Sequence, residues 1–320
     1  DEWLMSTWYD DADNDTYGNS LSWSLACSIP EYFSGMWIND YVFDVHYLSW
    51  GKILLWWNFW VMRITSTGAI DTTFSGAWVD YFVNTLAVQA DGKIVVWWSF
   101  STIGGVSRNF LARLTNTGAV DTTFNPGADN PVNNVIIQSD GKIIVGWWFT
   151  NIAWTARQFL ARLNSDGTID TTFTTTADDS VSVLEPQSNG TIFVGWWFTQ
   201  IWGFTSAWVA LLNADGSVNT WFSTSVNGVE AIVKHTNGNI YIWWTFTSVW
   251  WTSRRKIARL TSTGALDTSF NRNAMNRDWI YDLYEQPDGK VIVWWYFTSL
   301  WWVPRNSMAR LTSTGAIDTG

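Results

Sequence analysis

Three aspartates near the amino end have a spacing that suits calcium. The stretch DDADNDTYG places Asp11, Asp13 and Asp15 at alternate positions, as in the first half of a calcium loop, where carboxylate oxygens bind the cation. Thr16 stands where such a loop has its glycine, and Ser22 stands where it has a bidentate glutamate. We therefore predict a solvated terminal loop, and no cofactor other than calcium at this candidate site.

Tryptophans in loops are the second set of residues with binding chemistry. An exposed indole face stacks on a sugar ring and leaves its N–H free to donate a hydrogen bond. Loops that follow strands often carry binding residues. The candidates for a glycan-binding surface are the tryptophans that follow a Phe-Thr pair at the end of an apolar stretch: Trp154, Trp202, Trp250, Trp251, Trp301 and Trp302.

Catalytic motifs are absent from the sequence. It has no nucleophile elbow, no phosphate-binding Walker loop and no HExxH zinc motif. His46 and His235 are far apart, and the single cysteine, Cys27, excludes an internal disulfide and a cysteine-based zinc cluster. A pair of carboxylates could hydrolyse a glycosidic bond, but nothing in the sequence selects a pair. We predict that the protein is not an enzyme, with glycoside processing as an alternative.

Charge and hydropathy exclude two classes of partner. The 320 residues carry a net charge of −10, whereas nucleic-acid binders concentrate lysine and arginine on one face. The apolar stretches are far shorter than the roughly 20 residues that a membrane-spanning helix needs. The sequence predicts no nucleic-acid partner and no membrane insertion.

Most of the chain, including the loop tryptophans, consists of a repeat of 48 to 51 residues. Each unit has an apolar strand, an Asp-Gly or Asn-Gly turn typical of a β-hairpin, a second apolar strand and a third strand such as FLARLT. Each unit ends on a motif such as STGAIDTTF, in which the repeated acidic position is Asp71, Asp121, Asp170, Asn219, Asp267 and Asp318. About four short strands per unit and no helical periodicity predict an all-β fold, a β-propeller.

The repeat predicts the domain organisation as well. We expect a propeller of six blades in residues 34–320, at 34–74, 75–124, 125–173, 174–222, 223–270 and 271–320. Residues 1–33 end in SIPEYF, a degenerate copy of the closing motif. This segment is expected to supply the strand that closes the ring.

The repeat resembles a known family. The run QPDGKVIVWWYFTSLWWVPRNSMARLTSTGAIDTG is similar to the bacterial delta-60 repeat, whose β-propeller units read approximately as DGK, an apolar strand, GGxF, a Gly-Gly loop, R-N, ARL and DG-x-x-DTSF. The resemblance covers residues 34–319 and implies a propeller fold. It also implies a secreted, cell-surface or phage-encoded protein without assigned chemistry.

Tryptophan is the departure from that family. The Gly-Gly pair before x-Phe is represented here by Trp56–Trp57, Trp97–Trp98, Gly146–Trp147, Gly195–Trp196, Trp243–Trp244 and Trp294–Trp295. Glycine usually marks a close backbone approach or a positive φ, where an indole would clash. Either the blades are spaced widely enough to accommodate indole side chains, or some of the tryptophans in the sequence do not represent the natural residues.

The repeated aspartate and arginine are expected to stabilise the fold. An aspartate beside a glycine turn usually accepts hydrogen bonds from nearby backbone N–H groups. The arginine of the ARL motif is expected to pair with that aspartate, and it is present in five units and replaced by Leu211 in the fourth: Arg63, Arg113, Arg162, Arg259 and Arg310.

These observations predict a non-catalytic propeller that serves as a structural or protein-interaction module. Its expected place is an extracellular assembly, such as a virion appendage or a bacterial surface or secreted complex, with other protein subunits as partners. The first alternative is a lectin-like propeller that binds surface glycans with the loop tryptophans.

Deletion of residues 1–33 tests ring closure. We expect the shortened chain to aggregate or to lose cooperative unfolding, because removal of the closing strand exposes a sheet edge. Size-exclusion chromatography and urea unfolding measure both effects. A monomeric truncation as stable as the full chain would rule the closure out.

Overall fold

The computed structural model describes residues 42–48, 51–57, 60–81, 83–206, 208–229, 231–234, 238–243, 246–254, 256–270, 282–294, 299–300, 303–304 and 308–319. The predicted closing segment 1–33 lies outside these residues, as do Asp11, Asp13 and Asp15 of the candidate calcium loop and the loop residues Trp301 and Trp302. The count of six blades and the closure of the ring therefore stay predictions.

Every regular element in the described part of the chain is a β-strand, and all strand pairs are antiparallel, which confirms the all-β prediction. Within the same residues, no helix has the length and apolarity needed to cross a bilayer.

Three strands of each repeat form a meander that gives one sheet per unit. The first strands are β1 (Val42–Tyr47), β5 (Val83–Val88), β10 (Val132–Ile137), β15 (Val181–Pro186), β20 (Ala231–Lys234) and β25 (Asp282–Glu285). The second strands are β2 (Ile53–Trp57), β6 (Ile94–Trp98), β11 (Ile143–Trp147), β16 (Ile192–Trp196), β21 (Ile240–Trp243) and β26 (Val291–Trp294). The third strands are β3 (Trp60–Ile64), β9 (Leu111–Leu114), β14 (Leu160–Leu163), β19 (Val209–Leu212), β24 (Ile257–Leu260) and β29 (Met308–Leu311).

A two-stranded hairpin separates the second and third strands in five units. These hairpins are β7 (Thr102–Ile103) with β8 (Val106–Ser107), β12 (Asn151–Ile152) with β13 (Thr155–Ala156), β17 (Gln200–Ile201) with β18 (Phe204–Thr205), β22 (Ser248–Val249) with β23 (Thr252–Ser253), and β27 (Ser299–Leu300) with β28 (Val303–Pro304). In the first unit β2 pairs with β3 from end to end, and β4 (Ala77–Trp78) is added as a fourth strand. In the sequence, WVMRI follows WWNF in this unit where the next unit has the longer STIGGVSRNFLARL, and the difference is the loss of this hairpin.

The Asp-Gly turns join the first and second strands as expected. Between β5 and β6, Gln89 N donates to Lys93 O at 2.8 Å and Gly92 N donates to Gln89 O at 2.9 Å. Gly92 has a φ of 81°, which closes the turn, and Asp91 accepts a hydrogen bond from Lys93 N. The sequence-predicted hairpin is confirmed.

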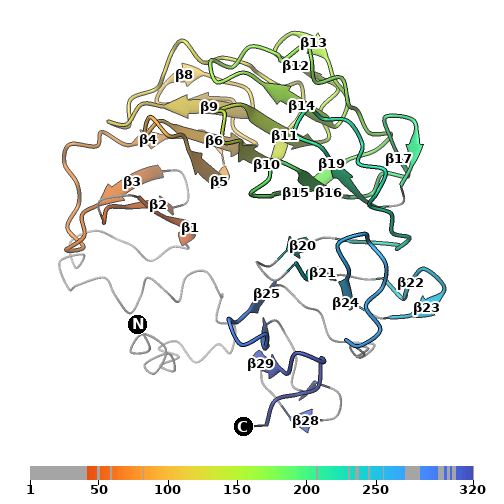
Figure 1. The fold of residues 1–320 in the computed structure, drawn as a ribbon. Helices are drawn as coiled ribbons and strands as arrows, with labels where there is room; N and C mark the ends of the chain where they lie inside the picture. The colour runs from red at the N-terminus through yellow and green to blue at the C-terminus, as the bar shows by residue number, and fades with distance from the viewer. Residues whose placement is uncertain are drawn as a thin grey trace.

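Successive sheets follow one another around an arc, from β1–β3 in orange to β25–β29 in blue (Figure 1). Neighbouring first strands contact one another, β1 with β5, β5 with β10, β10 with β15 and β15 with β20. The first strands therefore line the inner side of the arc, and the third strands lie further out, as in propeller blades.

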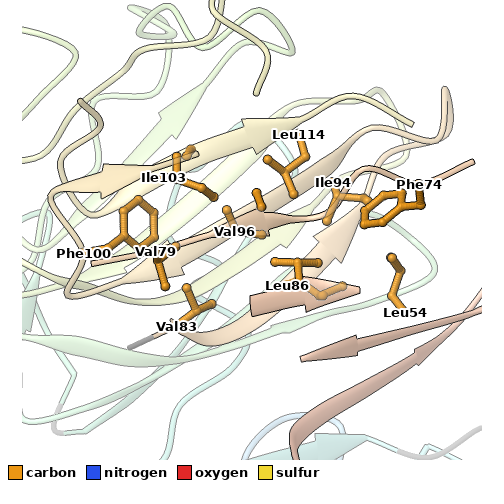
Figure 2. Packing of buried hydrophobic residues seen from close by; sticks show 13 residues of the cluster. Leu54, Phe74, Val79, Val83, Leu86, Ile94, Val96, Phe100, Ile103 and Leu114 are labelled. Carbon is orange, nitrogen blue, oxygen red and sulfur yellow. The ribbon is translucent and has the colours of Figure 1, made fainter. Parts of the chain in front are cut away.

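Apolar layers fill the space between neighbouring sheets. Figure 2 shows one layer, in which Leu54 of β2 lies near Leu86, Ile94 and Val96 of the next sheet. A second layer joins Val95 of β6 to residues of β10 and β11. Because both faces of a sheet are covered, the second strands are continuous apolar runs without alternation.

Each repeat has a phenylalanine at the same place after its second strand, which the sequence predicts to be buried, and its burial is confirmed in four units. Phe100, Phe149, Phe198 and Phe246 are 0% exposed. Phe59 and Phe297, the remaining members of the set, lie outside the described residues.

We expect Phe149→Ala to reduce the free energy of unfolding by about 3–5 kcal/mol, because it leaves a cavity in a packed layer. Urea unfolding measures the loss. Phe204→Ala is the control, since Phe204 is 45% exposed and its truncation should change stability by roughly 0.5 kcal/mol or less. A loss below about 1 kcal/mol at Phe149 would contradict the assigned position of this residue.

Candidate functional site

The repeated aspartate and arginine form an ion pair in five of the six units, as predicted. In the third unit, Arg162 Nε and Lys142 Nζ lie 2.8 and 2.9 Å from Asp170 Oδ2. Both Arg162 and Asp170 are 4% exposed. The same pairing joins Arg63 to Asp71, Arg113 to Asp121, Arg259 to Asp267 and Arg310 to Asp318.

The arginine also reaches the next unit along the chain. Arg162 Nη1 donates to the carbonyl oxygen of Ala214 at 2.5 Å, and its guanidinium lies 4.8 Å from the centre of the Phe173 ring. Equivalent bonds join Arg63 to Asn116 O at 2.7 Å and Arg259 to Ser313 O at 2.6 Å. One side chain thus binds its own carboxylate, an aromatic face and a neighbouring blade.

The other oxygen of the carboxylate holds the closing turn. Asp170 Oδ1 accepts hydrogen bonds from Thr172 N at 3.0 Å and from Thr172 Oγ1 at 2.7 Å. Burial by itself raises the pKa of Asp170, but these bonds and those from Lys142 and Arg162 outweigh it and hold the pKa well below its usual range. The carboxylate is a structural anion and is fully used by the fold.

The fourth unit replaces both partners together. Leu211 stands for the arginine and Asn219 for the aspartate. Asn219 still accepts a hydrogen bond from Trp221 N at 3.1 Å, and its amide donates to Asn213 Oδ1 at 3.0 Å. The turn survives, and no charge is left without a partner.

A second repeated aspartate was missed by the sequence analysis. Asp129 Oδ1 accepts from Thr150 N at 2.9 Å, and its Oδ2 accepts from Thr150 Oγ1 and from Asn151 Nδ2. Burial tends to raise the pKa of Asp129, but these hydrogen bonds lower it to about 2. Asp80 and Asp178 hold the neighbouring hairpins in the same way. The recurrence of aspartate at these three positions, 49 residues apart, was the signal in the sequence.

A buried arginine just after the hairpin donates hydrogen bonds to the closing turn of the repeat. Arg108 is 6% exposed, and its Nε and Nη2 donate to the carbonyl oxygens of Phe124 and Thr122, each at 3.0 Å. This residue is the arginine of the R-N element in the repeat, for which the sequence had suggested no role. It serves the closing turn and not a ligand.

Four of the predicted loop tryptophans lie at hairpin tips. Trp154 is 92% exposed and Trp251 is 98% exposed, while Trp202 and Trp250 are 49% and 40% exposed. They come from three different hairpins, and only Trp250 and Trp251 share one. The hairpins project from the outer side of the arc (Figure 1).

A cluster of four tryptophans, of which the sequence singled out Trp147 and Trp196 alone, joins the third and fourth units. The ring centres of Trp147 and Trp196 are 6.1 Å apart, and Trp197 lies 6.4 Å from Trp196 and 4.9 Å from Trp208. Trp97, by contrast, is buried between sheets, where its Nε1 donates to Asn133 O at 2.9 Å.

A metal site is not found in the described part of the chain. No group of three or more histidine, cysteine, aspartate or glutamate side chains there could hold an ion. The candidate calcium ligands lie outside that part.

We expect Asp121→Asn to lower stability by about 1–3 kcal/mol at neutral pH, because it leaves the buried Arg113 without its counter-charge. Burial raises the pKa of Asp121, but hydrogen bonds from Thr123 and the Arg113 charge bring it down to about 2. The stability that this carboxylate adds is present above its unfolded pKa near 4 and is lost as the pH falls toward 2. Urea unfolding between pH 7 and pH 2 should show a flatter profile for the variant.

The double variant Arg113→Leu/Asp121→Asn is the matched control, because it copies the fourth unit. We expect it to be more stable than Asp121→Asn, since no buried charge remains unpaired. A loss equal to the sum of the two single variants would show that the two residues act independently.

Comparisons with known proteins agree on the fold. The chain resembles the extracellular domain of the B. thetaiotaomicron protein BT3049, with 13% identity and a TM-score of 0.53 over 88% of this chain and 34% of that one. It therefore spans about a third of the length of that structure. A streptogramin B lyase aligns with 14% identity and a TM-score of 0.52, over 88% of this chain and 84% of the lyase.

A chain of the mitotic checkpoint complex gives a TM-score of 0.54 at 12% identity, over 88% of this chain and 77% of that chain. At such identities these likenesses show the propeller fold alone. No curated protein matches the sequence.

One family model matches the repeats. The model, described as a domain of unknown function (DUF5122) beta-propeller, matches residues 89–124, 138–173, 187–231, 237–270 and 286–320. These matches cover more than half of the chain, fall on successive repeats and confirm the resemblance to delta-60 propellers. The chain therefore belongs to the DUF5122 beta-propeller family.

Proposed function

We propose that this propeller is a structural or protein-interaction module of an extracellular assembly. The observation that carries the proposal is the row of anchored hairpins on the outer side of the arc. The arginine and aspartate that recur in five units are used in contacts of the fold, whereas the hairpins are a repeated feature that lies exposed. Such a row suits the recognition of another protein subunit.

The hairpins are held firmly enough to act as a recognition surface. In the third unit, Asp129 binds the start of the hairpin, and Ala153 N at its tip donates to Pro126 O at 2.6 Å. A bridge between Ala128 and Ile152 adds a further attachment. A loop that is ordered before binding loses less conformational entropy on association, which favours affinity.

The extracellular setting is also part of the proposal. It is supported by the resemblance to delta-60 repeats and by the extracellular domains among similar structures. A bacterial surface complex, a secreted complex and a virion appendage are the assemblies that fit it.

Glycan binding is a second candidate, favoured by one observation. The indoles of Trp154 and Trp251 are almost fully exposed at hairpin tips, where a sugar ring could stack on them. The two residues lie on different hairpins, so each would form a separate site.

Site-specific photo-crosslinking tests the proposal. A photoreactive residue at Ala156, which is exposed on β13, should crosslink to a protein subunit in the surface or secreted fraction of the producing cells. Ser139 is the matched control, since it is exposed in the turn at the opposite end of β11 and should give no crosslink. Equal crosslinking from both positions, or from neither, would contradict an interface on the hairpins.

A glycan array separates the two candidates. The interaction module should bind no sugar, whereas a lectin should bind one and lose it in Trp251→Ala. Hydrolysis of an arrayed sugar would instead indicate a glycoside-processing enzyme.

A further inference from the structure

Tryptophan and glycine exchange at equivalent positions of the repeat. At the end of the second strand, Trp97 corresponds to Gly146 and Gly195. At the hairpin tip, the pair Gly104–Gly105 of one unit corresponds to Trp250–Trp251 of another. The largest and the smallest residue thus occupy the same positions in a repeat whose backbone is otherwise constant.

The backbone at the strand end has a conformation suited to glycine. Trp98, Trp147 and Trp196 have φ values of 150°, 151° and 139°. L-residues are confined to negative φ and to a small left-handed region near +50 to +70°. A φ near +150° lies outside both, and glycine reaches it because it has no Cβ.

Tryptophans at the hairpin tips also have positive φ values. Trp202 and Trp250 have φ values of 48° and 52°, close to the 54° of Gly104 in the same place, and Trp154 has a φ of 59° in the place of Gly105, whose φ is 76°. Two-residue hairpins with positive φ strongly favour glycine, asparagine and aspartate. Trp154 is 92% exposed, so its ring gains little burial that could offset the strained backbone.

The position before Trp147, at Gly146, leaves little space for a side chain. A Cβ added to Gly146 would lie 2.6 Å from the carbonyl oxygen of Val181, closer than real Cβ contacts. In the third unit this place therefore has no room for a side chain, whereas Trp97 in the equivalent place of the second unit is buried between sheets.

Positive φ alone does not give this pattern. Phe110, Phe159 and Lys256 share another position with φ values of 63°, 64° and 66°. These values fall inside the left-handed region, both phenylalanines pack against the core, and glycine never occupies the position in the described units. Trp208 occupies the same position with a φ of 72° and also packs against the core, so the exchange with glycine is confined to the end of the second strand and the hairpin tips.

We propose that six tryptophans are translated as glycine in the cells that carry this gene: Trp98, Trp147, Trp154, Trp196, Trp202 and Trp250. The codon UGA accounts for an exchange between these two residues, because variant genetic codes read it either as tryptophan or as glycine. The protein made in those cells then has glycine wherever the backbone of the strand ends and hairpin tips demands it.

The proposal changes the surface that a partner meets. Without the indoles of Trp154, Trp202 and Trp250, the hairpin tips offer backbone and small side chains, and a glycan platform at these positions disappears. The hairpin anchors at Asp80, Asp129 and Asp178 are unaffected.

The codons and the mass of the natural protein test the proposal directly. Sequencing of the gene should find UGA at the six positions, and tandem mass spectrometry of the protein from cells that carry it should find glycine there. UGG codons, or peptides with the mass of tryptophan at these positions, would overturn it.

Recombinant chains give an independent readout. The variant with all six positions changed to glycine should unfold at a higher urea concentration than the tryptophan chain, or should fold where that chain does not. Phe159→Gly is the matched control and should lower the unfolding midpoint, because its position has positive φ but a packed side chain. A lower midpoint for the six-glycine chain than for the tryptophan chain would refute the proposal.

Discussion

The link that the repeated arginine makes between neighbouring blades is the interaction on which the rest of the structure depends. A propeller blade contacts only its neighbours, so its stability comes from the interface between one repeat and the next. Arg162 binds Asp170 in its own blade, covers the ring of Phe173 and donates to Ala214 in the next repeat. Apolar layers supply the bulk of the burial, and this polar link fixes how the repeats are placed on one another.

The recurring ionisable residues have a structural role, because their charged groups are taken up by contacts within the fold. Each repeated carboxylate accepts several hydrogen bonds, which keep it ionised and hold a turn or a hairpin. The fourth unit has Leu211 in place of the arginine and Asn219 in place of the aspartate, so that neither residue of the pair leaves a buried charge without its partner. The exposed hairpin row, to which we assign partner binding in the proposed function, is held in place by Asp80, Asp129 and Asp178.

Glycine sets the second constraint. The strand ends and hairpin tips follow the same backbone path in successive units, and that path needs positive φ at fixed places. An indole at such a place is strained and, at the hairpin tips, partly or almost wholly exposed. The binding surface of the protein therefore depends on whether these positions carry tryptophan or glycine.

The sequence by itself determined the repeat, the strand order within a unit, the Asp-Gly turns, the burial of Phe100 and its equivalents, and the Arg113–Asp121 pair. These features are local or recur with the period of the repeat, so they leave a pattern in a single chain. The bond from Arg162 to Ala214, the clamp of Asp129 on Thr150 and the contact of Trp147 with Trp196 were decided by tertiary structure. They join residues that are 21 to 52 positions apart, and their partners are brought together only when each blade folds and packs on the next.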